Sequence, residues 1–135
     1  NFLSTKGKKN YGWPISSYGE PYTKEAKTFY DKNGYLKKSH SDFGYIEPFK
    51  YFTPSIGISE IIYLQDMRNK IFLVSSLRAA SIYILELDDD IKKIKNLSRL
   101  YFGNTRVRDF KYDEETKFFF MILENTPAIG VLKNN

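Results

Sequence analysis

The chain has 135 residues, of which 41% are hydrophobic, 17% aromatic and 27% charged, and its formal net charge is +5. This composition is typical of a folded domain and excludes a disordered or low-complexity segment. The chain contains no cysteine, which excludes disulfides, thiolate metal ligands and a cysteine nucleophile. No apolar run reaches the roughly 18 residues that a membrane span requires.

Residues 1–57 are predicted to form a loop-rich segment with one or two short strands. This part of the chain is rich in Gly, Pro, Ser, Tyr and Lys and has little periodicity. The only histidine, His40, lies here between polar residues. A histidine in such a loop is expected to be solvated.

Residues 58–135 are predicted to form regular antiparallel strands. Short runs rich in Ile, Val, Tyr and Phe alternate with polar breaks, which is typical of an all-β fold. The predicted strands lie at residues 58–64, 70–76, 81–87, 99–102, 107–112, 117–123 and 128–132. Between residues 88 and 100, Ile91, Ile94 and Leu97 also fall at helical spacing. A helix is therefore the alternative for these residues, although a strand or loop is preferred.

Alternation within these runs predicts which side chains share a face of a sheet. In the run at 107–112, Arg108 and Phe110 are expected on one face and Val107 on the other. The three consecutive phenylalanines at 118–120 indicate a strand that is covered on both faces.

Two acidic breaks, at residues 88–90 and 113–117, are predicted to be solvated hairpin turns. The three aspartates at 88–90 do not form a calcium-binding loop of the EF-hand type. Such a loop would need oxygen ligands spread over about twelve residues and a glycine at its turn, and the sequence has neither here. The sequence also has no P-loop, no Gly-x-Ser-x-Gly and no His–Glu metal motif. With His40 as its only histidine, the chain is poor in general bases near neutral pH.

Four short segments carry the specific signal. They are Lys-Asn-Tyr-Gly-Trp-Pro at residues 9–14, Phe-Thr-Pro-Ser-Ile-Gly at 52–57, Val-Ser-Ser-Leu-Arg at 74–78 and Asn-Thr-Arg-Val-Arg-Asp at 104–109. In this order and spacing they resemble the C-terminal part of the glucose/sorbosone dehydrogenase family. This is the family of soluble aldose dehydrogenases that depend on pyrroloquinoline quinone (PQQ).

The resemblance implies a six-bladed β-propeller, in which each blade is a four-stranded antiparallel sheet. A blade takes roughly 40–50 residues, so residues 1–135 are expected to be a fragment that supplies the last two to three blades. The whole enzyme would oxidise an aldose sugar at C1 and pass the electrons to an external acceptor. By the same resemblance, its catalytic histidine and Ca²⁺ ligands lie upstream, so this chain alone is expected to be inactive. The family also implies a periplasmic or secreted bacterial protein.

The arginines at these motifs suit such a cofactor. PQQ is a planar quinone with three carboxylates, and arginine offers a planar bidentate fork that lysine lacks. Three of the five arginines of the chain, Arg78, Arg106 and Arg108, fall at motif positions. Arg106 and Arg108 are two apart at a strand start, so both side chains are expected on one side. The alternative is that Arg106 and the Arg108–Asp109 pair form ordinary surface ion pairs.

The resemblance also assigns roles to individual residues. Arg78 takes the position that reaches the quinone oxygens, and Arg106 and Arg108 take those of an arginine pair on the cofactor carboxylates. Ser55 takes the position of a hydroxyl that contacts the cofactor or the substrate. Residues Tyr51, Phe52 and Thr53 stand where many family members have a tryptophan on the substrate side.

The first motif is expected to be structural. Gly12 would permit a tight turn, and Trp13 would anchor it by burial.

Two other functions remain open from the sequence. The first is a non-catalytic β-propeller of the same family that binds a ligand or a protein, because a fold does not fix an activity. The second, weaker one is a basic β domain that binds nucleic acid, since basic composition alone is a weak signal. The preferred interpretation has a sugar and an electron acceptor as partners, and no nucleic acid.

Overall fold

The computed structural model describes residues 7, 9–13, 15–20, 23–25, 39–66, 69–125 and 127–133. The chain forms two compact units, Asn1–Ser55 and Ile56–Asn135.

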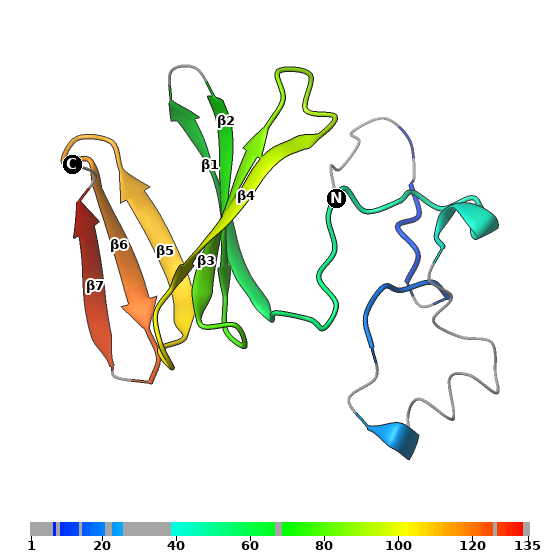
Figure 1. The fold of residues 1–135 in the computed structure, drawn as a ribbon, viewed down its shortest axis with the longest axis horizontal. Helices are drawn as coiled ribbons and strands as arrows, with labels where there is room; N and C mark the ends of the chain where they lie inside the picture. The colour runs from blue at the N-terminus through cyan, green and yellow to red at the C-terminus, as the bar shows by residue number, and fades with distance from the viewer. Residues whose placement is uncertain are drawn as a thin grey trace. The chain divides into compact units, whose positions relative to one another are not determined.

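The second unit consists of seven strands in two antiparallel sheets (Figure 1). The first sheet has the order β1-β2-β3-β4 and the second has the order β5-β6-β7. The predicted all-β class is confirmed, and a strand is found at each predicted position. The bounds are β1 (Ile58–Asp66), β2 (Asn69–Ser76), β3 (Ser81–Leu87), β4 (Ile94–Tyr101), β5 (Val107–Asp113), β6 (Phe118–Leu123) and β7 (Ala128–Lys133). A four-stranded antiparallel sheet of neighbouring strands is the unit from which β-propellers are built.

The segment at 88–100 is a turn followed by β4, so the helical alternative is wrong. The Asp88 carboxylate accepts hydrogen bonds from the backbone N–H groups of Lys92 at 2.6 Å and Lys93 at 3.0 Å. These bonds close a hairpin, and Ile91 adopts a left-handed backbone with φ of +57°. The apolar residues at 91, 94 and 97 therefore cannot share a helical face. The predicted hairpin turn is confirmed.

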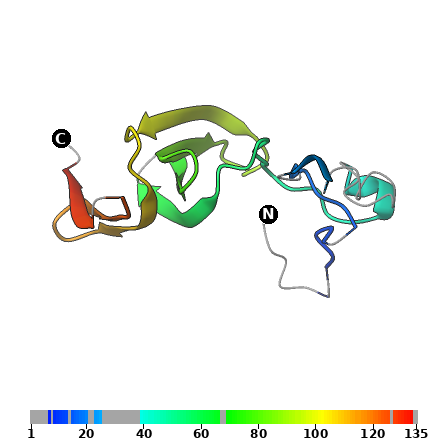
Figure 2. The ribbon, with the colours of Figure 1, turned by 90° about the horizontal axis from the view of Figure 1, so that it is seen from below.

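The hydrophobic core lies between the two sheets of this unit. Five residues form it: Leu73, Ile82, Val107, Phe110 and Met121. Strand β5 provides the contact with the first sheet, since it touches both β1 and β2. Figure 2 shows the two sheets from below, with β4 at the edge of its sheet.

Hydrogen bonds of a serine side chain connect the second sheet to the first. The Ser59 hydroxyl donates to the backbone oxygen of Val107 at 2.7 Å and lies 2.8 Å from the Ser75 hydroxyl. Ser75 is fully buried, so these polar groups need such partners inside the protein.

The predicted faces of β5 are wrong, because a β-bulge lies at the start of this strand. Val107 pairs with Leu123 and Asp109 pairs with Ile122, so Arg108 is an extra residue in the ladder. Strict alternation would place Val107 and Phe110 on opposite faces. The bulge rotates the strand, and both side chains enter the same core.

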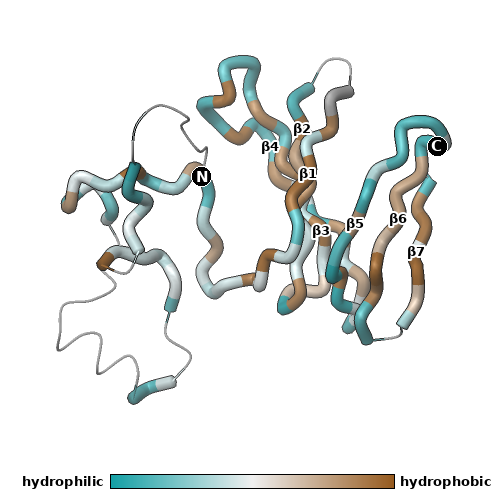
Figure 3. The backbone as a smooth tube through the Cα atoms, turned by 180° about the vertical axis from the view of Figure 1, so that it is seen from behind, coloured by the Kyte–Doolittle hydropathy of each residue, from teal (hydrophilic) through white to brown (hydrophobic). Residues whose placement is uncertain are grey.

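Strand β6 is covered on one face only in the part of the chain that the structure describes. Phe119, Met121 and Leu123 belong to the core or pack against it. Phe120 on the other face is 38% exposed, and its neighbours Ile122, Ile129 and Val131 are also exposed. The prediction of two covered faces is therefore wrong for these residues. Figure 3 shows the hydrophobic colour that runs along β6 and β7.

The first unit contradicts the expected environments of His40 and Trp13. His40, next to the short 3-10 helix Ser41–Phe43, is only 6% exposed rather than solvated. Its ring stacks on Tyr18 at 4.9 Å, and Gly12 leaves room for it because Gly12 has no Cβ. Trp13, which was expected to be buried, is 77% exposed. The tight turn at Gly12 is present, with φ of +104°.

Candidate anion-binding site at one end of the two sheets

The topology gathers three connections at the same end of the second unit. Because neighbouring strands are antiparallel, every second connection returns to the same end. The β2–β3 turn, the β4–β5 connection and the β6–β7 turn lie at one end, and the acidic turns at 88–90 and 114–115 lie at the other. Arg78, Arg99 and Arg106 lie at or near the first end.

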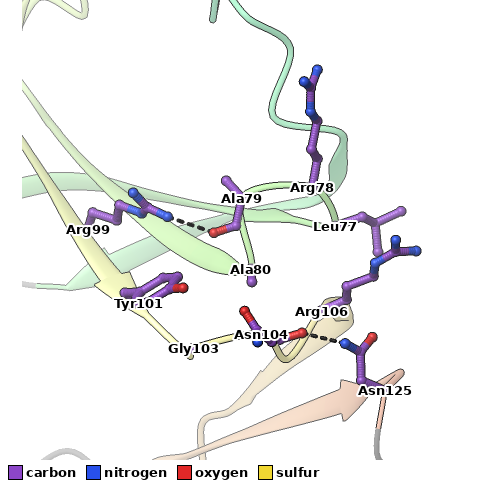
Figure 4. Close-up of a pocket in the computed structure, with 10 residues that line it drawn as sticks. All are labelled: Leu77, Arg78, Ala79, Ala80, Arg99, Tyr101, Gly103, Asn104, Arg106 and Asn125. Carbon is purple, nitrogen blue, oxygen red and sulfur yellow. Dashed lines mark hydrogen bonds between the residues drawn. The ribbon is translucent and has the colours of Figure 1, made fainter.

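A cavity of about 320 Å³ opens at the basic end (Figure 4). Its walls come from all three connections and from the end of β4. Three arginines line it together with polar and aromatic side chains; these residues are Arg78, Arg99, Arg106, Tyr101, Asn104 and Asn125.

Arg78 lies in the β2–β3 turn, and the segment before β1 holds that turn in place. The backbone N–H of Leu77 donates to the Gly57 oxygen at 2.7 Å, and that of Arg78 donates to the Ile56 oxygen at 2.9 Å. Gly57 has φ of +62°, and a Cβ there would lie 3.3 Å from the Arg78 nitrogen. A glycine is therefore needed where the two segments meet.

Arg99 in β4 is a site residue that sequence reasoning missed. Its Nε donates to the Ser81 hydroxyl at 2.6 Å, and its Nη2 donates to the Ala79 backbone oxygen at 2.7 Å. The guanidinium lies 4.9 Å from the ring centre of Tyr101 and 5.6 Å from that of Tyr83. These contacts hold the cation in place at the wall of the cavity. Figure 4 shows Arg99 turned toward Ala79, while Arg78 and Arg106 extend from their turns.

Arg106 and Arg108 both reach the same carboxylate, that of Glu124. Arg108 Nη2 lies 2.7 Å from Glu124 Oε1, and Arg106 Nη1 lies 3.8 Å from the same oxygen. Arg106 lines the cavity, whereas Arg108 is outside its described lining. The ion-pair partner of Arg108 is therefore Glu124 and not the adjacent Asp109.

The other predicted site residues lie in the first unit. Tyr51, Phe52 and Thr53 line a cavity of about 410 Å³, together with three residues that precede them, Pro48, Phe49 and Lys50. Tyr51 stacks on Tyr18 at 4.1 Å, and the Thr53 hydroxyl donates to the Tyr18 backbone oxygen at 2.7 Å. Ser55 is the last residue of this unit. The arginines and the predicted substrate-side residues thus belong to different units.

One polar pair supports the Tyr51 stack. The Tyr18 hydroxyl donates to Glu47 Oε2 at 2.5 Å. This hydrogen bond is the main cause that raises the pKa of Tyr18 to about 12. The same bond, with the backbone N–H of Ser41, lowers the pKa of Glu47.

The arginines that line the cavity can donate hydrogen bonds to an anionic ligand. No group of three or more His, Asp or Glu side chains there is placed to hold a metal ion. The histidine is buried under Gly12, with its Nδ1 unpartnered among the described residues. The described part of the chain also contains no helix that is long and apolar enough to span a membrane.

Comparison with known proteins gives a match to a family model. Neither the curated proteins nor the solved structures contain a match to this chain. The sequence model of the Glucose / Sorbosone dehydrogenase family matches residues 3–129, which is nearly the whole chain. The predicted resemblance is therefore confirmed, and the two antiparallel sheets agree with the β-propeller fold of that family. The chain belongs to the glucose/sorbosone dehydrogenase family.

Proposed function

We propose that this chain forms part of a PQQ-dependent oxidoreductase that oxidises an aldose sugar at C1 and passes the electrons to an external acceptor. Membership of the family supports a sugar dehydrogenase function in general terms. The cavity at the basic end of the second unit would hold the cofactor. A periplasmic or secreted location is part of the proposal and rests on the family resemblance alone.

The observation that carries this proposal is the cavity lined by three arginines, Arg78, Arg99 and Arg106. A planar molecule with three carboxylates needs several cationic donors in one small space, and arginine provides them in a fork geometry. The volume of about 320 Å³ lies at the lower end of ligand pockets, which suits a compact ligand. Asn104 and Asn125 add neutral polar groups to the same wall.

The residues of this chain would bind and orient the cofactor. Arg106 and Arg99 would take carboxylates, and Arg78 would donate to the quinone oxygens, where negative charge develops during reduction. Bound PQQ supplies the electron sink for the hydride of the sugar. Tyr51, Phe52 and Thr53 would provide the sugar side, with the aromatic rings offering faces on which a pyranose can stack. Ser55 would contribute a hydroxyl donor to the cofactor or the sugar.

The general base and the Ca²⁺ ligands are proposed to lie outside this chain. His40 does not serve as the base in this proposal, because its ring is buried beneath Gly12 in the first unit. Within the proposal, the role of this chain is therefore cofactor binding rather than proton transfer.

The proposal is tested by titrating PQQ into the intact protein in the presence of Ca²⁺ and measuring the quenching of the protein's fluorescence. Replacing both Arg106 and Arg108 by alanine should weaken binding by at least tenfold, because one charge-assisted hydrogen bond contributes about 1.5–3 kcal/mol. The circular dichroism spectrum should stay unchanged. Lys111→Ala is the matched control, since it removes one exposed positive charge from the same strand.

Retained PQQ absorbance after dialysis of the intact protein would support the proposal. If the protein supplied with Ca²⁺ shows no such absorbance, the proposal fails, and a non-catalytic propeller of the same family becomes the better interpretation.

A further inference from the structure

Glu124, at the start of the β6–β7 turn, is an acidic residue that contacts two of the candidate arginines. Its Oε1 lies 2.7 Å from Arg108 Nη2 and 3.8 Å from Arg106 Nη1. Its other carboxylate oxygen, Oε2, is buried and has no hydrogen-bond partner among the described residues. A buried oxygen without a partner costs free energy, while the arginine contacts of Oε1 stabilise the same carboxylate.

The backbone around Glu124 is tied to the connection that carries Arg106. The Glu124 N–H donates to the Arg106 backbone oxygen at 3.0 Å. The side-chain amide of Asn125 donates to the Asn104 backbone oxygen, which Figure 4 shows as a dashed line. The β6–β7 turn therefore holds Asn104 and Arg106, the two residues of this connection's end that line the cavity together with Gly103.

The two arginine contacts of Glu124 are unequal, and the difference separates their roles. A distance of 2.7 Å is a short charge-assisted hydrogen bond, which fixes the Arg108 guanidinium. A distance of 3.8 Å is too long for a hydrogen bond, so Glu124 attracts Arg106 without occupying a donor of its guanidinium. Arg106 can then present its donors to the cavity that it lines.

We propose that Glu124 is a positioning residue, which anchors Arg108 and holds Arg106 toward the cavity for an anionic ligand. This inference rests on the proposed function, since PQQ is the ligand for which the site is proposed. The inference predicts that loss of Glu124 weakens binding of the anion, whereas simple electrostatics predicts the opposite. A carboxylate beside an anion site repels the ligand, so its removal should tighten binding if charge alone mattered.

The test is PQQ titration of the intact protein with Glu124→Ala and Glu124→Gln. Glu124→Ala should weaken PQQ binding about two- to fivefold, the order of effect of one lost ion pair between partly exposed side chains. Glu124→Gln keeps an oxygen that can accept from Arg108, so its affinity should stay closer to that of the parent protein. Glu114→Ala is the control, because Glu114 is an exposed acid at the far end of the β5–β6 hairpin. Tighter or unchanged binding in both Glu124 variants would overturn the inference.

A second measurement is independent of PQQ and separates this inference from the proposed function. The side-chain N–H signals of Arg108 in NMR spectra should be protected from exchange in the parent protein and lose that protection in Glu124→Ala. If the alanine variant unfolds, Glu124→Met provides the same measurement, because its side chain is of similar length and has no oxygen to accept from Arg108. Unchanged arginine signals would overturn the positioning role. A parent protein that fails to bind PQQ overturns the proposed function instead, while the arginine signals still decide the role of Glu124.

Discussion

Gly12 lies at the point where the first motif meets the buried histidine. Its backbone φ is +104°, and a Cβ at this position would lie 2.1 Å from His40 Nδ1 and 2.8 Å from the Ser16 backbone oxygen. Alanine at residue 12 therefore meets two separate penalties. One is a backbone conformation that side chains rarely adopt, and the other is a collision with a ring held by stacking on Tyr18.

The two penalties can be given magnitudes. A strained φ costs on the order of 1–3 kcal/mol. Insertion of a methyl group into a packed interior costs about 1–3 kcal/mol more. We expect Gly12→Ala to lower the free energy of unfolding by about 2–6 kcal/mol.

A double-mutant cycle separates the contributions. His40→Ala removes the ring but leaves the φ strain and the contact with the Ser16 oxygen. The double variant should therefore be more stable than the sum of the single effects by about 1–3 kcal/mol. Urea unfolding of the four proteins gives the free energies. Additive effects, or a Gly12→Ala cost below about 1 kcal/mol, would refute the argument that His40 fills the space beside Gly12.

Two further predictions concern the core and a perturbed acid. Phe110 is 3% exposed between the two sheets, and its replacement by alanine should lower the free energy of unfolding by about 3–5 kcal/mol. The control Lys111→Ala, at an exposed position, should change this free energy by less than about 0.5 kcal/mol. Equal effects of the two variants in chemical unfolding would contradict the core assignment. Tyr18 should titrate near the pKa of about 12 that its hydrogen bond to Glu47 causes, and Glu47→Gln should return this pKa toward about 10. Because the folded state favours the neutral phenol, the hydrogen bond contributes fully to stability below a pH of about 10, and this contribution is lost as the pH rises through 12. An ultraviolet titration in which Tyr18 ionises near its ordinary pKa would exclude the bond.

The strands were predictable because their signal is local. Apolar runs bounded by polar turns specify a strand without reference to the rest of the chain, and all seven were found. The Asp88 hairpin follows from a carboxylate that accepts bonds from backbone N–H groups a few residues further on. Where the local pattern was ambiguous, at residues 88–100, the hairpin decided against a helix.

The positions of individual side chains were less predictable, because they depend on residues far apart in the sequence. Strict alternation placed Val107 and Phe110 on opposite faces, but one extra residue in the ladder against β6 reverses that pattern. His40 has polar neighbours in sequence, yet it is buried because Gly12, 28 positions away in the numbering, leaves space for its ring.

By itself, the sequence determined the all-β class, the strand order along the chain, the family and three candidate arginines. These follow from short-range periodicity and from motifs that are contiguous in the chain. Only the tertiary structure decided that Arg99 shares a cavity with Arg78 and Arg106, and that Glu124 holds Arg108. The physical reason is the antiparallel topology, which brings the ends of β2, β4 and β6 together. Residues that share this end need not share a motif, so no local pattern could reveal their contact.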